Sequence, residues 1–174
     1  MRRDGVHYRS AIDLACGQSK DWIDHYAAEC ANALNFEIGA DAWELVNRLG
    51  GRLQVQDIFS NSFDDDTLFV HGPHDFDMVL SSVSGPRRDR FTIAHELGHY
   101  FLHSHQGRYP LVAARSGSDR AEWEANWFAA GFLMPTVQFL AAMNRGDSSR
   151  LLAAQFGVSE SAAEIRKKVL KGES

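Results

Sequence analysis

The chain has 174 residues, of which 44% are hydrophobic and 24% are charged, and its net charge is −5. This composition is ordinary for one globular domain with its own core, and the length is too short for two comfortable domains. The negative charge excludes a general electrostatic attraction to nucleic acid or anionic lipid. No apolar run approaches the roughly 20 residues that a membrane-spanning helix requires.

The two cysteines, Cys16 and Cys30, indicate the compartment in which the chain works. Two lone thiols without a spaced framework favour a reducing environment, although a single bridge between them stays open. The basic start of the chain lacks an uninterrupted apolar segment, so we expect no signal peptide. We therefore predict a cytoplasmic protein.

The hydrophobic pattern predicts helices, then strands, then helices. Residues 1–18 show weak periodicity, so we expect a loose N-terminal arm followed by a single domain over residues 19–174, whose part from about 135 to 174 is helical. The acidic run at 64–66 is more simply a solvated turn than a cation site. The elements expected in chain order are helices at 20–36 and 41–50, strands at 52–58, 67–72 and 75–83, helices at 89–103 and 119–134, and two or three short helices within 136–172.

This order favours an α+β domain in which a small sheet packs against a central helix, the one predicted at 89–103. Asp41 is the expected N-cap of the second helix, and Pro135 is expected to stop the helix that begins at about residue 119. The polar stretch at 104–118 is expected to be a loop.

The predicted central helix contains the pattern H-E-x-x-H at His95, Glu96 and His99, within the segment RFTIAHELGHYFLH. Residues four apart lie on one face of an α-helix, about 6 Å apart along its axis, so the two imidazoles can converge on one zinc ion. Glu96 falls on the flank of that face, where its carboxylate can reach a metal-bound water. We therefore predict His95 and His99 as zinc ligands and Glu96 as a general base for hydrolysis.

The alternative is a histidine-rich helix that holds no metal. The residues around the motif are apolar, so the helix should be buried, and unsatisfied histidine and glutamate side chains there would cost several kcal/mol. Gly98 is unfavourable inside a helix by about 1 kcal/mol relative to alanine, so we expect another backbone to approach it closely. Both observations favour the metal site.

His103 lies eight positions beyond His95, about 12 Å along a continuous helix, so we do not expect it to bind the same ion. The longer zinc motif with a third histidine requires a glycine where Leu102 stands, and its third histidine would be His105. That class is therefore excluded. We place His103 at the helix end or in the cleft wall, as a candidate for a supporting residue behind the metal ligands.

Catalytic zinc usually takes three protein ligands and leaves one position for water. The helix predicted at 119–134 contains Glu122 and Glu124, which point to nearly opposite sides. Glu122 shares its side with small residues that allow close packing on the histidine helix, whereas Glu124 shares its side with aromatic residues, which suits a structural or solvent-edge position. We choose Glu122 as the third ligand, and we expect Asn126 to accept a ring N–H from a ligating histidine.

The two blocks RFTIAHELGHYFLH and EWEANWFAAGFLMP resemble the ImmA/IrrE family of zinc metallopeptidases. The flanking segments LVNRLGGRLQVQDI, FDMVLSS and AAQFGVSESAAEIRKKV are similar to other parts of that family, so the resemblance covers roughly residues 20–170. Phe132 stands where the family often has leucine. The resemblance implies a zincin-like fold with one Zn²⁺ on His95, His99 and Glu122, and with Glu96 as the base.

Members of this family typically act on helix-turn-helix repressors of mobile elements or stress responses. The resemblance therefore implies a protein substrate of that kind, a helix-turn-helix repressor or an antitoxin. In zincin-like folds a strand just before the active helix can pair with an extended substrate peptide, so Met78, Val79 and Leu80 are candidate substrate-binding residues. An ordinary strand inside the sheet is an equal alternative for them.

A different class of function comes from residues 151–169, which resemble half of a helix-turn-helix and carry several basic side chains near their end. The start of the second helix is acidic and small, and the net charge is negative, so we expect a packing role and no DNA binding. We expect no membrane partner. A further alternative is a regulatory protein that holds zinc and binds a repressor or antitoxin without cleaving it, although an intact Glu96 argues against this.

Overall fold

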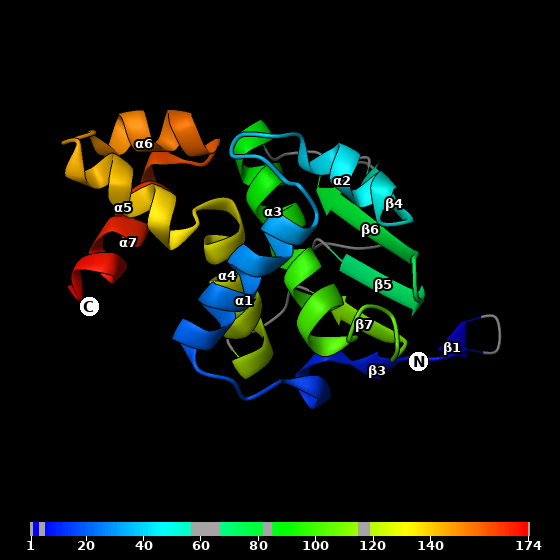
Figure 1. Cartoon of the computed structure of the whole chain (residues 1–174). Coiled ribbons are helices and arrows are strands. Elements are labelled where there is room, and N and C mark those ends of the chain that lie inside the picture. Colours follow the sequence, from blue (N-terminus) through cyan, green and yellow to red (C-terminus); the bar gives the residue numbers. More distant parts are fainter. Residues whose placement is uncertain (1, 4–5, 57–66, 82–84, 115–118, 174) are drawn as a thin grey trace.

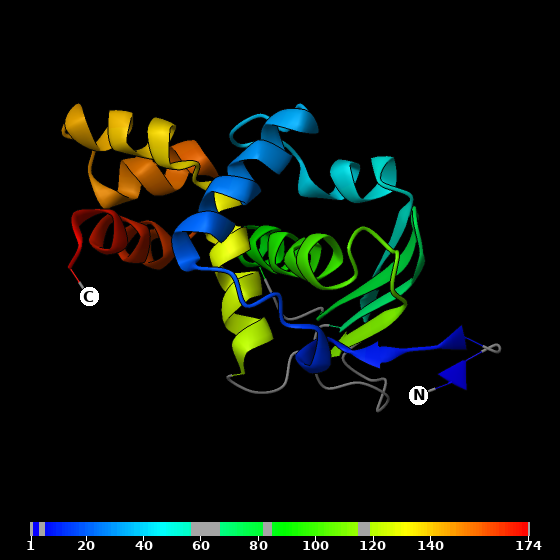
Figure 2. The same cartoon turned by 60° about the horizontal axis from the view of Figure 1, so that its bottom comes forward.

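A layer of three helices separates a small sheet from a group of C-terminal helices (Figure 1). The structure, a computed structural model, describes residues 2–3, 6–56, 67–81, 85–114 and 119–173. In the central layer, α4 (Arg120–Leu133) packs on both α1 (Lys20–Ala33) and α3 (Pro86–Gly98). Figure 2 shows the sheet and the C-terminal helices on opposite sides of this layer. The fold is therefore α+β, as the sequence predicted, with the histidine helix at its centre.

In the part of the chain that the structure describes, five strands form one mixed sheet in the order β3-β7-β5-β6-β4. β3 runs parallel to β7, β5 runs antiparallel to both β7 and β6, and β4 runs parallel to β6. Alternate side chains of β5 and β6 enter the core, since side chains alternate across a strand. The strands are β3 (Arg9–Ser10), β4 (Gly51–Gln56), β5 (Thr67–Gly72), β6 (Asp75–Ser81) and β7 (Leu111–Ala114).

The helix ends follow local sequence signals. The Asp41 side chain accepts a hydrogen bond from the Trp43 amide and caps α2 (Ala42–Arg48), which confirms the predicted N-cap. α3 begins at Pro86, three residues earlier than predicted, because proline suits the first helical position, where its missing N–H has no partner to lose. After Gly98 the helix continues as a π-helix, η2 (His99–His103).

Gly98 lies where α3 and α4 come closest. A Cβ atom added to it would meet Ala125 Cα at 3.0 Å and Ala125 O at 3.2 Å. A larger residue at this position would therefore collide with the backbone of α4. This confirms the predicted close backbone approach, which brings the two helices together beside the histidines.

From Tyr8 onward, the segment that we expected to form a loose arm lies against the domain. Tyr8 is buried, and β3 pairs with β7, a strand that was not predicted within the expected loop at 104–118. The short helix η1 (Ala11–Leu14) follows and buries Ala11. Before it, β1 (Arg2–Arg3) and β2 (Val6–His7) pair with each other. Cys16 and Cys30 are both free thiols.

An ion pair formed by a buried arginine links the C-terminal helices to the central layer. They are α5 (Thr136–Asn144), α6 (Ser149–Phe156) and α7 (Glu160–Lys171). Arg166 of α7 pairs with Asp24 of α1 at 2.5 Å and donates to the Met134 carbonyl oxygen at 2.8 Å. In the described ranges, no helix is both long and apolar enough to cross a membrane. The acidic run at 64–66 lies outside the described residues.

Candidate metal centre

α3 and η2, its continuation as a π-helix, present His95 and His99 side by side within the core. Both residues are 1% exposed, and their Nε2 atoms are 3.3 Å apart. They lie one helical turn apart on the side of α3 that α4 covers, as the H-E-x-x-H spacing predicted. Two imidazole nitrogens therefore face the same point.

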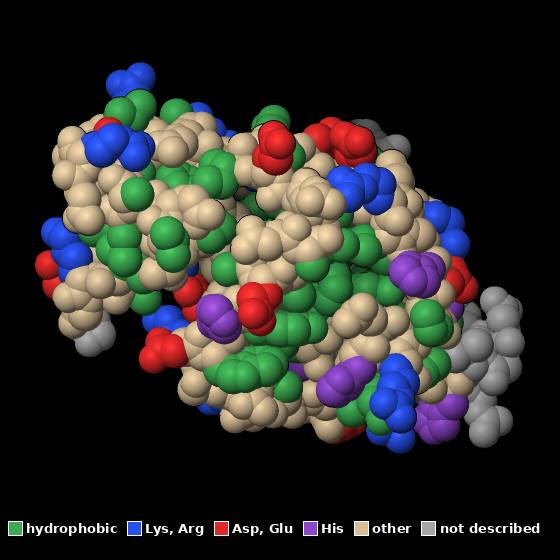
Figure 3. Space-filling view, viewed as in Figure 1, with side chains coloured by type: hydrophobic (Ala, Val, Ile, Leu, Met, Phe, Trp, Pro, Cys, Tyr) green, Lys and Arg blue, Asp and Glu red, His purple; other side chains and the backbone are tan. Residues whose placement is uncertain are grey.

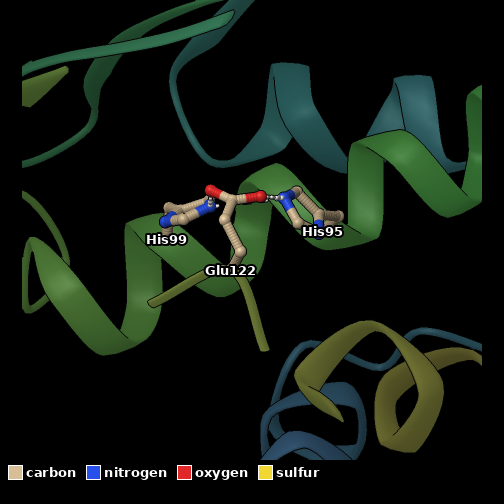
Figure 4. Close-up of side chains that lie close together, drawn as sticks. All are labelled: His95, His99 and Glu122. Carbon is tan, nitrogen blue, oxygen red and sulfur yellow. Dashed lines mark hydrogen bonds and ion pairs between the residues drawn. The ribbon is translucent and has the colours of Figure 1, made fainter. Parts of the chain in front are cut away.

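Glu122 of α4 brings a carboxylate to that point. Its Oε2 atom lies 3.3 Å from His95 Nε2, and its Oε1 atom lies 3.2 Å from His99 Nε2. Figure 4 shows the carboxylate between the two imidazole rings. The helix N-cap Asp119, which accepts a hydrogen bond from the Glu122 amide, fixes the start of α4 and so the position of Glu122.

These three side chains fit a metal ion. Among the residues that the structure describes, His95, His99 and Glu122 are the one group of three whose ligand atoms lie within 4.8 Å of one another. Two imidazoles and a carboxylate are a donor set that catalytic zinc sites use, with the fourth position left to water. The arrangement is thus a buried cluster compatible with a metal ion.

The protonation states suit metal binding. Burial lowers the pKa of His99 to about 4, so its imidazole is neutral near pH 7, although the hydrogen bond with Glu122 acts in the opposite direction. Burial raises the pKa of Glu122, but the hydrogen bonds with His95 and His99 outweigh this effect, and the net pKa lies well below its usual value. Neutral imidazole and ionised carboxylate are the forms that bind a metal.

The far ring nitrogens of the two histidines also have partners. Asn126 Oδ1 lies 3.0 Å from His95 Nδ1, the contact that we expected from its place one turn after Glu122. His103 Nδ1 lies 2.9 Å from His99 Nδ1. His103 is the last residue of η2, as the expected place at the helix end requires, and it is fully buried and not one of the three candidate ligands. Such outer partners fix the tautomer and orientation of a ligating ring.

Glu96 is buried beside His95 on α3, at 1% exposure. It follows His95 directly in the sequence, within the H-E-x-x-H pattern. Its role as a base remains a prediction.

Glu124 is the residue whose importance sequence reasoning missed. It is fully buried, whereas a structural or solvent-edge position was expected. Its carboxylate bonds with His103 Nε2 at 3.0 Å and with the amide of Cys16 at 2.8 Å. The spacing of Glu122 and Glu124 could have indicated this role, because one helix can supply a metal ligand from one side and, from another side, a carboxylate that bonds to a histidine beside the ligands.

Of the two equal alternatives for β6, an edge that pairs with a substrate peptide or an ordinary strand inside the sheet, the pairing of the strands favours the second. β6 lies between β4, which pairs with residues 76–81, and β5, which pairs with residues 75–79. Met78 and Val79 are therefore paired on both edges, and Leu80 is paired with β4. Met78 and Leu80 point into the core and are buried, and Val79 lies on the opposite face. These three residues therefore form an ordinary interior strand, and the outer strands of the described sheet are β3 and β4.

Comparisons with known proteins show a family to which the chain is similar. The profile of the Peptidase M78 family, described as the IrrE N-terminal-like domain, matches residues 52–168 and so includes α3 and α4. The chain is 33% identical over 75 residues to "Metallopeptidase ImmA" of Bacillus subtilis (strain 168), a match that covers 41% of this chain and 44% of that protein.

A solved structure shares the fold. The chain superposes on a "Mycobacterium tuberculosis transcriptional regulator" with a TM-score of 0.59 and 19% identity, over 91% of this chain and 51% of that one. At this identity the likeness concerns the fold alone. The chain therefore spans about half the length of the two proteins that it matches.

Proposed function

The chain belongs to the ImmA/IrrE family of metallopeptidases, as its two sequence blocks predicted, and from this premise we propose that it is a zinc-dependent endopeptidase acting on a protein substrate. The observation that carries the proposal is the convergence of His95, His99 and Glu122 on one buried point, with Glu96 on the same helix. A metal site without a catalytic role does not need a glutamate at position 96.

In this proposal, His95, His99 and Glu122 hold one Zn²⁺. When bound, zinc lowers the pKa of a water molecule and polarises the substrate carbonyl. With the ion in place, Glu96 would accept a proton from the attacking water, whose oxygen would bond to the carbonyl carbon. Glu96 would then pass that proton to the amide nitrogen as the C–N bond breaks and the amine leaves. Asn126 accepts the Nδ1–H of His95, which would leave the Nε2 atom of His95 to bind the ion.

We propose a helix-turn-helix regulator, a repressor or an antitoxin, as the substrate, within the cytoplasm. The support is the resemblance of the chain to a family whose members typically act on such regulators. DNA binding by the C-terminal helices is not favoured. α7 begins with Glu160 in its first turn, and on the face shown in Figure 3 the Lys and Arg side chains are scattered and do not gather into one patch.

The test compares the wild-type chain with Glu96→Gln, both loaded with zinc. Each is incubated with the helix-turn-helix protein encoded beside its gene, and the products are analysed by mass spectrometry. We expect one zinc per chain in both proteins and a single cleavage site in the substrate with the wild type alone. Equal cleavage by Glu96→Gln would overturn the mechanism. Binding of the regulator without cleavage by the wild type would favour the regulatory alternative.

A further inference from the structure

A buried carboxylate stands behind the metal ligands. Glu124 is fully buried on α4 and is not one of the three candidate ligands. Its Oε2 atom accepts a hydrogen bond from the Cys16 amide at 2.8 Å, and its Oε1 atom accepts from the Gly17 amide and from Arg120 Nε, each at 2.8 Å. Backbone amides and guanidinium groups only donate, so both oxygens of Glu124 act as acceptors and the carboxylate is ionised.

This carboxylate determines which nitrogen of His103 carries the proton. His103 Nε2 lies 3.0 Å from Glu124 Oε2. Since the carboxylate oxygen can only accept, Nε2 is the nitrogen that donates. In a neutral ring the other nitrogen, Nδ1, is then an acceptor with a free lone pair.

The acceptor at His103 Nδ1 faces a metal ligand. His103 Nδ1 and His99 Nδ1 are 2.9 Å apart, and the two ring centroids are 4.9 Å apart. When His99 binds a metal through Nε2, its remaining proton sits on Nδ1 and requires an acceptor. His103 provides one only while Glu124 holds the His103 proton at Nε2. Without Glu124, a proton on His103 Nδ1 would oppose the proton on His99 Nδ1.

The carboxylate is in turn held by the N-terminal segment. Cys16 and Gly17 donate to it through their backbone amides, and Arg120, which also bonds Glu124, donates to the carbonyl oxygen of Gln18. Residues 16–18 lie outside the stretch at 52–168 that matches the family profile. Residues 16–18, which precede the stretch that matches the family profile, thus contact the series of hydrogen bonds that runs from Glu124 through His103 to His99.

We propose that Glu124 and His103, supported by the backbone of residues 16–18, are positioning residues that hold His99 in the tautomer and orientation required for metal binding. The inference rests on the metal site of the proposed function. A carboxylate bonded to a ligating histidine directly, or through one further ring, raises the basicity of the ligand, and loss of such partners typically weakens metal binding about 10- to 100-fold. The other histidine, His95, has the neutral amide of Asn126 as the partner of its Nδ1 atom.

The experiment measures the zinc affinity of the full chain by competition with a coloured chelator. His103→Phe retains a ring of similar size but cannot bond with either neighbour, so we expect the Kd for zinc to rise about 10- to 100-fold. His103→Gln presents an amide that can donate to Glu124 and accept from His99, so we expect it to recover most of the affinity. The matched control is His71→Phe, which removes a histidine that bridges Tyr8 and Asp77 on the sheet and is expected to leave the Kd unchanged.

A second measurement separates positioning from a general loss of structure. Nitrogen NMR of metal-free wild type, labelled at histidine, is expected to show His103 protonated at Nε2 and unprotonated at Nδ1. Protonation at Nδ1 would overturn the inference, as would an unchanged zinc affinity in a folded His103→Phe. If His103→Phe does not fold, Glu124→Gln takes its place and is judged on the same affinity. Wild-type protein that binds no zinc would overturn the proposed function as well, whereas zinc binding that is insensitive to His103 overturns this inference alone.

Discussion

Replacing Gly98 with alanine tests whether close contact between α3 and α4 builds the metal centre. The added Cβ would lie 3.0 Å from Ala125 Cα, 3.2 Å from Ala125 O and 3.2 Å from Phe128 Cβ. These atoms belong to the backbone of α4 or are attached directly to it, so no flexible side chain can yield. α4 must move away by a few tenths of an ångström.

The expected magnitude follows from two opposing effects. Overpacking of a core costs about 1–3 kcal/mol, whereas alanine is better than glycine inside a helix by about 1 kcal/mol. The net loss of stability in the metal-free protein is therefore about 1 kcal/mol, or about 2–4 °C in the melting temperature of a chain of this size. In Gly98→Ala, zinc binding must draw Glu122 back towards the histidines and so press α4 against the added methyl group again. We therefore expect zinc to bind about tenfold more weakly, which corresponds to about 1.4 kcal/mol.

The assay is thermal unfolding of the metal-free protein followed by circular dichroism, combined with zinc titration against a chelator. Gly72→Ala is the control, because a Cβ added at Gly72 meets no atom within 4 Å. A Gly98→Ala protein that is as stable as the wild type and binds zinc equally well would refute the reasoning.

Two other perturbations follow from buried charges. The metal-free protein should lose stability as the pH falls from about 6.5 to about 4, because His99 has a pKa of about 4 in the folded protein and takes up a proton more readily when unfolded. The loss in unfolding free energy from this residue is about 3 kcal/mol, measured by urea unfolding. A stability that does not change over that pH range would contradict the prediction. Arg166→Leu should cost about 3 kcal/mol in the same assay, because it leaves Asp24 and a buried carbonyl without their partner. Arg145→Leu removes an exposed arginine that bonds with Asp147 and Gln155 and should cost less than about 1 kcal/mol. Equal effects of the two substitutions would refute the distinction.

The sequence predicted the features whose cause is local. The spacing of His95 and His99 and the unfavourable glycine between them depend on one helix, so the pattern alone indicated both the pair of imidazoles and the close approach of a second helix. Glu122 was preferred over Glu124 because small residues share its side of α4, and the structure brings Glu122, not Glu124, to the two imidazoles.

The features that the sequence did not predict depend on partners far along the chain. β7 is a four-residue strand that pairs with β3 and β5. Its residues form a short apolar run within a polar stretch, and four residues are too few for a periodic pattern to identify a strand. The position of β6 inside the sheet depends on β4 pairing with it in parallel, which no local pattern specifies. The burial of Glu124 depends on Cys16, more than a hundred residues earlier, so it could not be seen from the helix alone.

The central claim is that His95, His99 and Glu122 hold one zinc ion. The most direct measurement is the zinc content of purified wild type and Glu122→Ala after dialysis against a chelator of moderate affinity, with both proteins checked for native circular dichroism. We expect one zinc per chain in the wild type and a small fraction of that in Glu122→Ala, because two imidazoles alone bind zinc weakly. Zinc retained in full by Glu122→Ala, or absent from the wild type, would contradict the account.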